Sequence, residues 1–194
     1  MPGRSDGCPI VDRDGTLWMI DGRGSTGDAF GDVWRYPAGG GHWEFVDLGR
    51  PAPARWGPAC WLDPDGTVRL FGGQAGGTFF GDLWSVDIHG AGTGSWKQLG
   101  AESGIGPRSG AAAALHTDRA VIVGGVASTG AILDSIGIAD VRDQAITQIY
   151  STGPGASGRA RATLIDDPAA ERMLLFGGLT SIGVSNEIWQ AVLR

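Results

Sequence analysis

The fold of this chain is decided by the stretch Val68-Arg69-Leu70-Phe71-Gly72-Gly73, which is followed by Gly81-Asp82-Leu83-Trp84-Ser85-Val86. The stretch joins an apolar run, a glycine pair and a second β-rich run, and an arginine, Arg55, stands ahead of it. The same order of features occurs four times along the chain. Repetition at a fixed spacing indicates that the chain is built from equivalent structural units.

The glycine pair measures the length of the repeat. Gly73, Gly125 and Gly178 lie 52 and 53 residues apart, and the degenerate Asp21-Gly22 lies 51 residues before the first of them. The arginine that opens each copy keeps this spacing at four positions: Arg4, Arg55, Arg108, and either Arg159 or Arg161. A period of about 50 residues is longer than that of helical-pair repeats, leucine-rich repeats or WD-type blades, and it matches the kelch length.

The repeated residues resemble the kelch repeat of β-propellers, and the resemblance covers essentially the whole chain. It rests on Arg108-Ser109-Gly110-Ala111, the glycine pairs, Asp82-Leu83-Trp84, and Trp96 followed by Leu99. The resemblance implies an all-β, kelch-type β-propeller, with one domain over residues 1–194. The blades implied are approximately 4–53, 54–106, 107–157 and 158–194.

The number of blades implies an incomplete ring. Kelch propellers mostly have six or seven blades by the same resemblance, and the fourth copy ends before an outermost strand. We therefore expect four recognisable blades that form part of a larger ring, which further blades or self-association would complete.

The strand pattern supports this interpretation independently of the family. Each copy divides into four short β-rich runs separated by turn residues, including Asp-Gly pairs at 14–15 and 65–66 that suit tight hairpins. The middle runs, such as 119–123 and 173–176, are almost continuously apolar. Such runs predict strands buried on both faces between neighbouring blades.

The repeated glycines and tryptophans are predicted to be structural. Glycine allows close approach of neighbouring backbone, and tryptophan buries a large apolar area between blades. The set comprises Gly72, Gly73, Gly124, Gly125, Gly177, Gly178, Trp84, Trp96 and Trp189. In the third copy Ile136 and Ile146 take the two tryptophan positions, so we expect looser packing in that blade.

The two cysteines, Cys8 and Cys60, lie in the first strands of adjacent copies. Alignment on Asp12 and Asp63 places them one residue out of register, and neighbouring residues of a strand point to opposite faces. We therefore predict buried free thiols rather than a disulfide, and the redox compartment stays open.

The candidate binding face carries the loops between the second and third strands of each copy. Connections alternate ends in an up-and-down sheet, so these loops share a face with the connections between blades. The resemblance implies that loop residues and the opening arginines contact acidic or polar ligand groups, which a guanidinium binds well. The candidate ligand-binding residues are Arg23, Arg55, Gln74, Phe79, Phe80, Arg108, Ser128 and Arg159. The alternative role for the repeated arginines is structural, with each one holding its own inter-blade loop.

A carboxylate also recurs once in each copy, just before the third strand. The positions are Asp32, Asp82, Asp134 and Glu187. Repetition favours a structural hydrogen-bonding role, because a catalytic pair breaks the symmetry of a repeat. A two-carboxylate hydrolase that uses Asp82 and Asp134 is the catalytic alternative.

Composition and isolated motifs argue against several other classes of function. A formal charge of −6 disfavours nucleic acid as a partner, and no apolar stretch is long enough to span a membrane. The sequence shows no signal peptide either, and the cellular compartment stays open. Gly22 to Gly27 matches G-x-G-x-x-G, but a strand follows it where a dinucleotide site needs a helix. The histidines (His42, His89 and His116) are expected on the opposite face, without metal-ligand spacing.

Two functional hypotheses follow. The first is a non-catalytic binding module that holds a protein or peptide, with a glycan as the other ligand class, and needs neither cofactor nor metal. The second is the propeller portion of a larger enzyme, either a galactose-oxidase-like oxidoreductase or a carbohydrate-active hydrolase. For the copper-radical version this chain offers only Tyr36 and Tyr150 as tyrosines. We favour the binding module.

Overall fold

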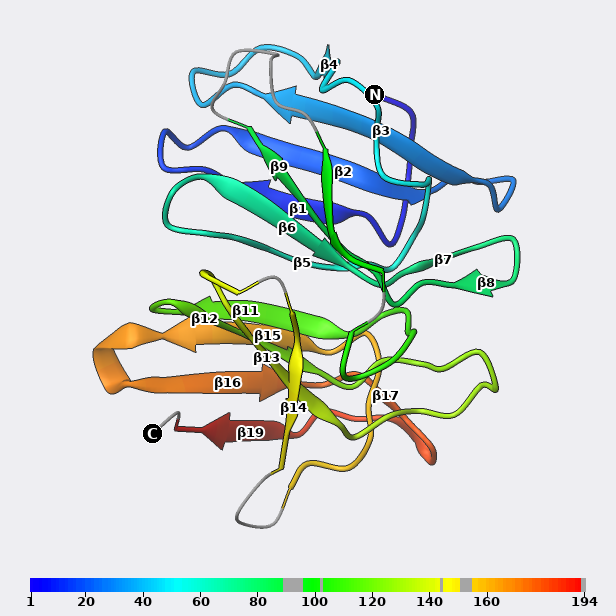
Figure 1. The fold of residues 1–194 in the computed structure, drawn as a ribbon, viewed down its shortest axis with the longest axis vertical. Coiled ribbons are helices and arrows are strands. Elements are labelled where there is room, and N and C mark those ends of the chain that lie inside the picture. The colour runs from blue at the N-terminus through cyan, green and yellow to red at the C-terminus, as the bar shows by residue number, and fades with distance from the viewer. Residues whose placement is uncertain (89–95, 102, 144, 151–154, 193–194) are drawn as a thin grey trace.

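The computed structural model describes residues 1–88, 96–101, 103–143, 145–150 and 155–192. In this part of the chain four antiparallel sheets follow one another in sequence and pack face to face as propeller blades (Figure 1). Blade one contains β1 (Cys8–Val11), β2 (Leu17–Arg23), β3 (Ala29–Tyr36) and β4 (Glu44–Val46). Blade two contains β5 (Ala59–Leu62), β6 (Thr67–Phe71), β9 (Leu83–Asp87) and β10 (Lys97–Gly100).

Blades three and four repeat the arrangement. Blade three contains β11 (Ala112–His116), β12 (Arg119–Val123), β13 (Ile136–Asp140) and β14 (Thr147–Ile149). Blade four contains β15 (Thr163–Asp167), β16 (Arg172–Phe176) and β19 (Ile188–Ala191), so it has three strands in the described residues, as expected. Two small hairpins extend blades two and four: β7 (Gln74–Ala75) with β8 (Thr78–Phe79), and β17 (Leu179–Thr180) with β18 (Gly183–Val184). The helical content of the described part is one 3-10 turn, Pro168–Ala170. The predicted all-β propeller with four blades is confirmed.

The four blades share one pairing register, which makes residues equivalent from blade to blade. The residue just before each glycine-pair position pairs with the first residue of the innermost strand. These pairs are Cys8↔Ile20, Ala59↔Phe71, Ala112↔Val123 and Thr163↔Phe176. In each pair, the residue of the innermost strand lies on the sheet face that is directed toward the next blade along the chain.

Three apolar clusters fill the spaces between consecutive blades. Ile20 and Val33 of blade one meet Val68 and Leu70 of blade two in the first cluster. The second joins blades two and three, and the third joins blades three and four. The strands are buried on both faces because each blade contributes opposite faces to successive clusters, which accounts for their continuous apolar runs.

The prediction for the tryptophan position of blade three was wrong. Trp84 pairs with Leu70, and the residue that pairs with the equivalent Ile122 is Gly137, not Ile136. A Cβ added at Gly137 would lie 2.7 Å from Ile146 and 2.8 Å from Ile105. These two isoleucines are 3% and 7% exposed and occupy the volume of the missing indole, so this position is filled and not loosely packed.

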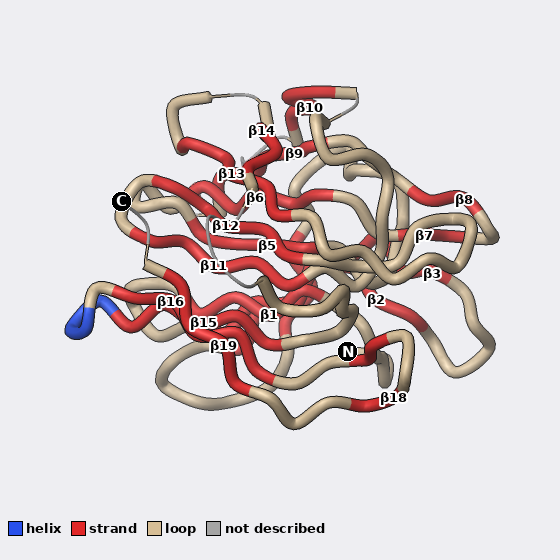
Figure 2. The backbone as a smooth tube through the Cα atoms, turned by 90° about the horizontal axis from the view of Figure 1, so that it is seen from below, coloured by secondary structure: helices blue, strands red, loops and turns tan. Residues whose placement is uncertain are grey.

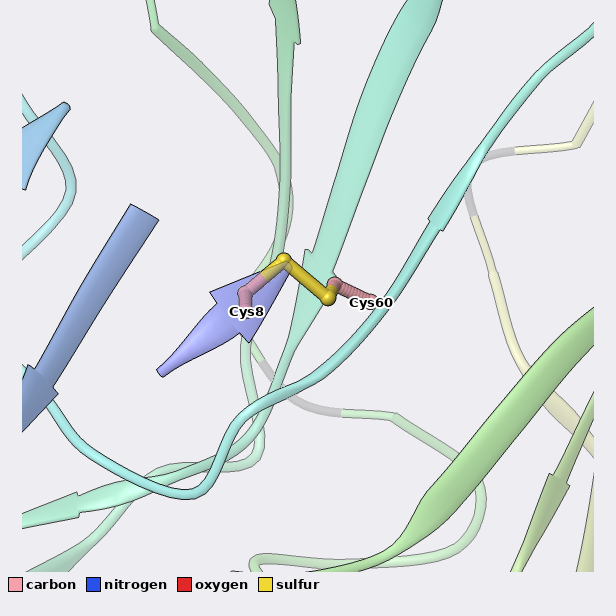
Figure 3. The surroundings of a disulfide bond; sticks show 2 residues. All are labelled: Cys8 and Cys60. Carbon is pink, nitrogen blue, oxygen red and sulfur yellow. A yellow bond between two sulfur atoms is a disulfide. The ribbon is translucent and has the colours of Figure 1, made fainter. Parts of the chain in front are cut away.

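The prediction of free cysteines was also wrong, since Cys8 and Cys60 form a disulfide between β1 and β5 (Figure 3). Their Cα atoms are 6.1 Å apart. The one-residue offset does place Cys8 and Cys60 on opposite sheet faces, each within its own blade. Where two blades pack together, however, one face of the first blade meets the opposite face of the second. The offset therefore brings both cysteines into the space between blades one and two. The bond closes a loop of 52 residues, which corresponds to about 4 kcal/mol of stabilisation in the chain-entropy model.

Candidate functional site

The repeated arginine lies buried within its own blade, where it joins three parts of the chain. Arg55 is fully buried, and its Nη1 donates to the Gly72 carbonyl oxygen at 2.8 Å and to Asp82 Oδ1 at 2.6 Å. Its Nη2 donates to Asp82 Oδ2 at 3.1 Å, and the indole of Trp84 donates to the same oxygen at 2.6 Å. Asp82 therefore holds both the arginine and the tryptophan of the repeat.

The same network recurs in blades one and four. Arg4 pairs with Asp32 at 2.5 Å, and Arg159 pairs with Glu187 at 3.1 Å. In each blade the arginine also donates to the carbonyl at the first position of the glycine pair, and the tryptophan donates to the carboxylate. The repeated arginines of these blades thus make the contacts expected of a structural role, and the two carboxylates and Asp82 accept the hydrogen bonds.

Blade three lacks the carboxylate. Asp134 is exposed, and Arg108 Nη1 instead donates to Ser135 Oγ at 2.8 Å and to the Gly124 carbonyl at 2.9 Å. The expectation that Asp134 continues the carboxylate series was wrong by one residue. Arg108 makes no ion pair with any described residue, and burial lowers its pKa to about 10.

Replacement of Ser135 with aspartate is predicted to stabilise the protein. The carboxylate would reach Arg108 as Asp82 reaches Arg55, and a hydrogen bond to a buried charge contributes about 2 kcal/mol. Urea unfolding at neutral pH measures the gain. Ser128→Asp, in an exposed loop of the same blade, makes the same change of charge without the arginine and is the control. Equal stability of the two variants would contradict the assignment.

Three backbone hydrogen bonds connect each pair of consecutive blades, and we call them the junction bonds. In the first, the second glycine of the pair donates its N–H to the carbonyl of the next blade's arginine: Gly22 to Arg55, Gly73 to Arg108 and Gly125 to Arg159, at 2.8–3.0 Å. In the second, that arginine donates its own N–H back to a loop carbonyl: Arg55 to Phe30, Arg108 to Phe80 and Arg159 to Leu133, at 3.0–3.2 Å. These bonds fix the position of each blade against the next.

The third junction bond runs around the axis of the propeller. Asp6, Gly57, Gly110 and Arg161 hold equivalent positions, and all four have positive φ between 53° and 68°. The N–H of each of the last three donates to the carbonyl of the one before it at 2.7 Å. Asp6 and Arg161, which carry side chains at this position, also form an ion pair at 3.7 Å.

The first glycine of each pair leaves space for the junction. Gly124 has φ +70°, and a Cβ there would overlap the carbonyl oxygen of Arg159. A Cβ at Gly72 would lie 2.6 Å from the carbonyl oxygen of Arg108. The glycine is thus required by both its conformation and its contact with the next arginine.

In blade one this position is occupied by Asp21, with φ +58°. Its side chain is only 2% exposed, and its Oδ2 has no hydrogen-bond partner in the described part of the chain. Burial raises the pKa of the Asp21 carboxyl well above its ordinary value, while the charges of Arg55 and Arg4 act in the other direction. Asp21 is therefore a costly residue at the first junction.

Asp21→Gly is predicted to raise the free energy of unfolding at neutral pH by about 1–3 kcal/mol, because it removes a buried unsatisfied group and a non-glycine residue at positive φ. A raised pKa in the folded state means that the wild type loses stability as pH rises from below the ordinary value, near 4, through the folded pKa. The gain from Asp21→Gly should therefore shrink as pH falls. Denaturation between pH 3 and pH 8 tests this, with Asp21→Asn to isolate the charge. A gain independent of pH would contradict the role of the charge.

The four hairpins between second and third blade strands project from one side of the molecule, on the right in Figure 1. We call this side the loop face. Within it, the residue after each glycine pair forms a bridge with the residue after each repeated arginine. These bridges are Ser5↔Arg23, Trp56↔Gln74, Ser109↔Val126 and Ala160↔Leu179. Arg23 and Gln74 thus occupy equivalent places in their blades.

The structure separates the predicted ligand-binding residues into buried and accessible groups. Arg55, Arg108 and Arg159 are 0%, 3% and 1% exposed, so their guanidinium groups serve the blades. The accessible members are Arg23 and Ser128, which are exposed, and Gln74, Phe79 and Phe80, which are half-buried. Phe80 packs beneath Arg55, whose guanidinium carbon lies 4.2 Å from the ring centroid.

The guanidinium of Arg23 lies over the indole of Trp56, 4.8 Å from the ring centroid. Trp56 and the Asp6–Arg161 pair were not among the predicted site residues. Both sites have small residues at the equivalent positions of another blade. Ser109 is equivalent to Trp56, and Gly110 is equivalent to Asp6 and Arg161. Departure of a large or charged residue from the repeat was the signal that could have found them.

The geometry gives little support to the catalytic alternatives. Asp82 is 7% exposed and both its oxygens are bonded to Arg55 or Trp84. The G-x-G-x-x-G segment covers the end of β2 and the turn that leads into β3, so a strand follows it and not a helix. Across the described ranges, no three histidine, cysteine, aspartate or glutamate side chains gather as metal ligands would.

The histidines lie away from the loop face where the structure describes them. His116 ends β11 at the opposite edge and contacts Asp166 of β15 at 2.7 Å. His42 is exposed, and His89 lies outside the described residues. The described residues include no helix that could cross a membrane.

Consecutive antiparallel sheets, arranged about one axis and joined by equivalent bonds, define a β-propeller repeat protein. The family model described as the KLHDC2/KLHL20/DRC7 Kelch-repeats domain matches residues 1–178. The chain belongs to this Kelch-repeat family. No curated protein matches it.

Proposed function

We propose that this propeller is a binding module that holds a protein or peptide segment on its loop face, with Arg23, Trp56, Gln74 and Phe79 as the contact residues. The observation that carries the proposal is the Arg23–Trp56 pair, in which an exposed cation is stacked on an aromatic ring beside the propeller axis. Kelch-repeat propellers are commonly protein-interaction modules.

The two kinds of arginine in this protein support the division between scaffold and site. The repeated arginines are buried and hydrogen-bonded to their own blades, so they give the loops a rigid base. Arg23 is exposed, and stacking on Trp56 orients the plane of its guanidinium group. A guanidinium oriented in this way recognises carboxylates and carbonyl oxygens with little loss of side-chain entropy.

The neighbouring residues extend the site across two blades. Gln74 pairs with Trp56 through the backbone, so it lies next to the stacked pair. Phe79 pairs with Gln74 in the β7–β8 hairpin and adds a half-buried aromatic ring. Together these residues offer a cation, an amide and apolar rings, a combination that suits an extended peptide with an acidic group beside an apolar side chain.

Selection of peptides from a random library on the immobilised protein tests the proposal. Peptides that are retained should bind at least tenfold more weakly to Arg23→Ala and to Phe79→Ala, since hot-spot residues typically contribute about 2 kcal/mol or more. Affinities are measured by fluorescence anisotropy.

Arg142→Ala is the matched control, because Arg142 is an exposed arginine in the turn between β13 and β14 on the opposite side. Its affinity for the selected peptides should equal that of the wild type. Failure to retain any peptide, or full binding by both loop-face variants, would refute the proposed site.

A further inference from the structure

We propose that the Cys8–Cys60 disulfide controls the loop-face site through its redox state. The oxidised bond keeps blade one closed on blade two, so that Arg23 stays stacked on Trp56. Reduction by a thiol allows this junction to open and weakens the binding of the ligand. The inference rests on the proposed function, but the opening of the junction can be measured without a ligand.

The Arg23–Trp56 pair lies across the junction between blades one and two. Arg23 ends β2 of blade one, and Trp56 precedes β5 of blade two. The junction bond from the Gly22 N–H to the Arg55 carbonyl, at 3.0 Å, joins the two residues directly before them. The end of β2 and the β7–β8 hairpin of blade two project on the same side in both views (Figure 1 and Figure 2). The geometry of the site therefore depends on how closely these two blades meet.

The disulfide lies close to this pair along the chain. Cys60 follows Trp56 by four residues, and Cys8 follows Asp6 by two. The Asp6 carbonyl accepts a junction bond from the N–H of Gly57 at 2.7 Å. The covalent bond thus links the same two segments that form the backbone bonds of the first junction. It keeps these segments at a high local concentration whenever their backbone bonds break.

The second and third junctions have apolar residues where the first has its cysteines. The pairing register gives the equivalent pairs, which are Ala59 with Ala113 and Ala112 with Leu164. Each of these pairs lies in one of the apolar clusters between blades. The fold therefore closes a junction without a disulfide, and the covalent bond at the first junction has a separate cause.

Asp21 supplies that cause, because it weakens the first junction. It occupies the position that holds a glycine, Gly72 or Gly124, at the second and third junctions. Its carboxyl group is buried, and one oxygen of that group has no partner among the described residues. Opening of the junction would return the carboxyl group to water and remove the cost of its burial. The junction that carries this destabilising group is thus the one that carries the covalent bond.

Reduction begins at Cys60, since this residue is half-buried while Cys8 is 0% exposed. A thiolate of the reductant forms a bond to Cys60 Sγ, the S–S bond breaks, and Cys8 leaves as a thiolate that takes up a proton. A second thiolate then attacks the sulfur of the reductant in this mixed disulfide and releases Cys60, which is also protonated. Two electrons pass to the cysteines, and the reductant becomes a disulfide.

Amide hydrogen exchange, followed by NMR with and without dithiothreitol, measures the opening of the junction. Reduction should lower the protection factors of the Gly22 and Gly57 amides at least about tenfold, because the tether limits local opening only while it is intact. The equivalent amides of the second junction, Gly73 and Gly110, are the internal control and should change less than about threefold. Equal losses at all four amides, no loss at the first two, or a disulfide that the folded protein retains in dithiothreitol would overturn the proposal.

Asp21→Gly should keep the first junction closed after reduction. In the reduced variant the Gly57 amide should retain at least about tenfold more protection than in the reduced wild type, because the group that favours opening is gone. Asp14→Gly, at an exposed aspartate in the β1–β2 turn of the same blade, is the matched control and should behave as the wild type. Equal protection in the two reduced variants would contradict the role of Asp21.

Affinity for peptides selected on the oxidised protein tests the effect on the site. The reduced wild type should bind them at least about tenfold more weakly, since only the closed junction forms the site, and reduced Asp21→Gly should bind them as oxidised Asp21→Gly does. Unchanged affinity in a reduced protein whose junction has opened would contradict the redox control. If the oxidised protein retains no peptide, the proposed function and its control fail together, while the exchange rates still decide whether the bond holds the junction closed.

Discussion

A guanidinium buried at the inner end of each blade is the constraint on which this structure depends. It cannot be left without partners in an apolar interior, since an unpaired buried charge is strongly destabilising. In blade two Arg55 resolves this by binding the carbonyl of Gly72 and the carboxylate of Asp82, which also accepts from Trp84. The Arg55 guanidinium thereby connects the end of β6, the start of β9 and the segment that leads into blade two.

The positions that depart from the repeat show what the network requires. Blade three keeps Arg108 but has Ser135 in place of the carboxylate and Gly137 in place of the tryptophan, so the negative charge and the indole are lost together. Two isoleucines restore the apolar volume but not the negative charge. Blade one keeps arginine, aspartate and tryptophan but places Asp21 where the junction needs a glycine. Blade three therefore lacks the negative charge of the network, and blade one carries a buried carboxylate at its junction.

Much of the fold could be predicted from the sequence, because the spacing of repeated residues gives the length and approximate boundaries of each blade. The spacing of Gly73, Gly125 and Gly178 predicted the blades, and the apolar runs predicted burial on both faces. The disulfide was missed because facing sheets were treated as one sheet, although the offset of Cys8 from Cys60 was correct. The site was predicted only in part, since sequence does not distinguish a buried arginine such as Arg55 from an exposed one such as Arg23.

The most direct test of the central claim is a double-mutant cycle on Arg55 and Asp82, measured as the free energy of unfolding in urea. Either single replacement by alanine should cost about 3–5 kcal/mol, because it leaves the other charge buried and unpaired. The double variant should lose at least about 2 kcal/mol less than the sum of the singles. Additive losses, or single losses below about 1 kcal/mol, would show that the buried ion pair does not hold the blade together.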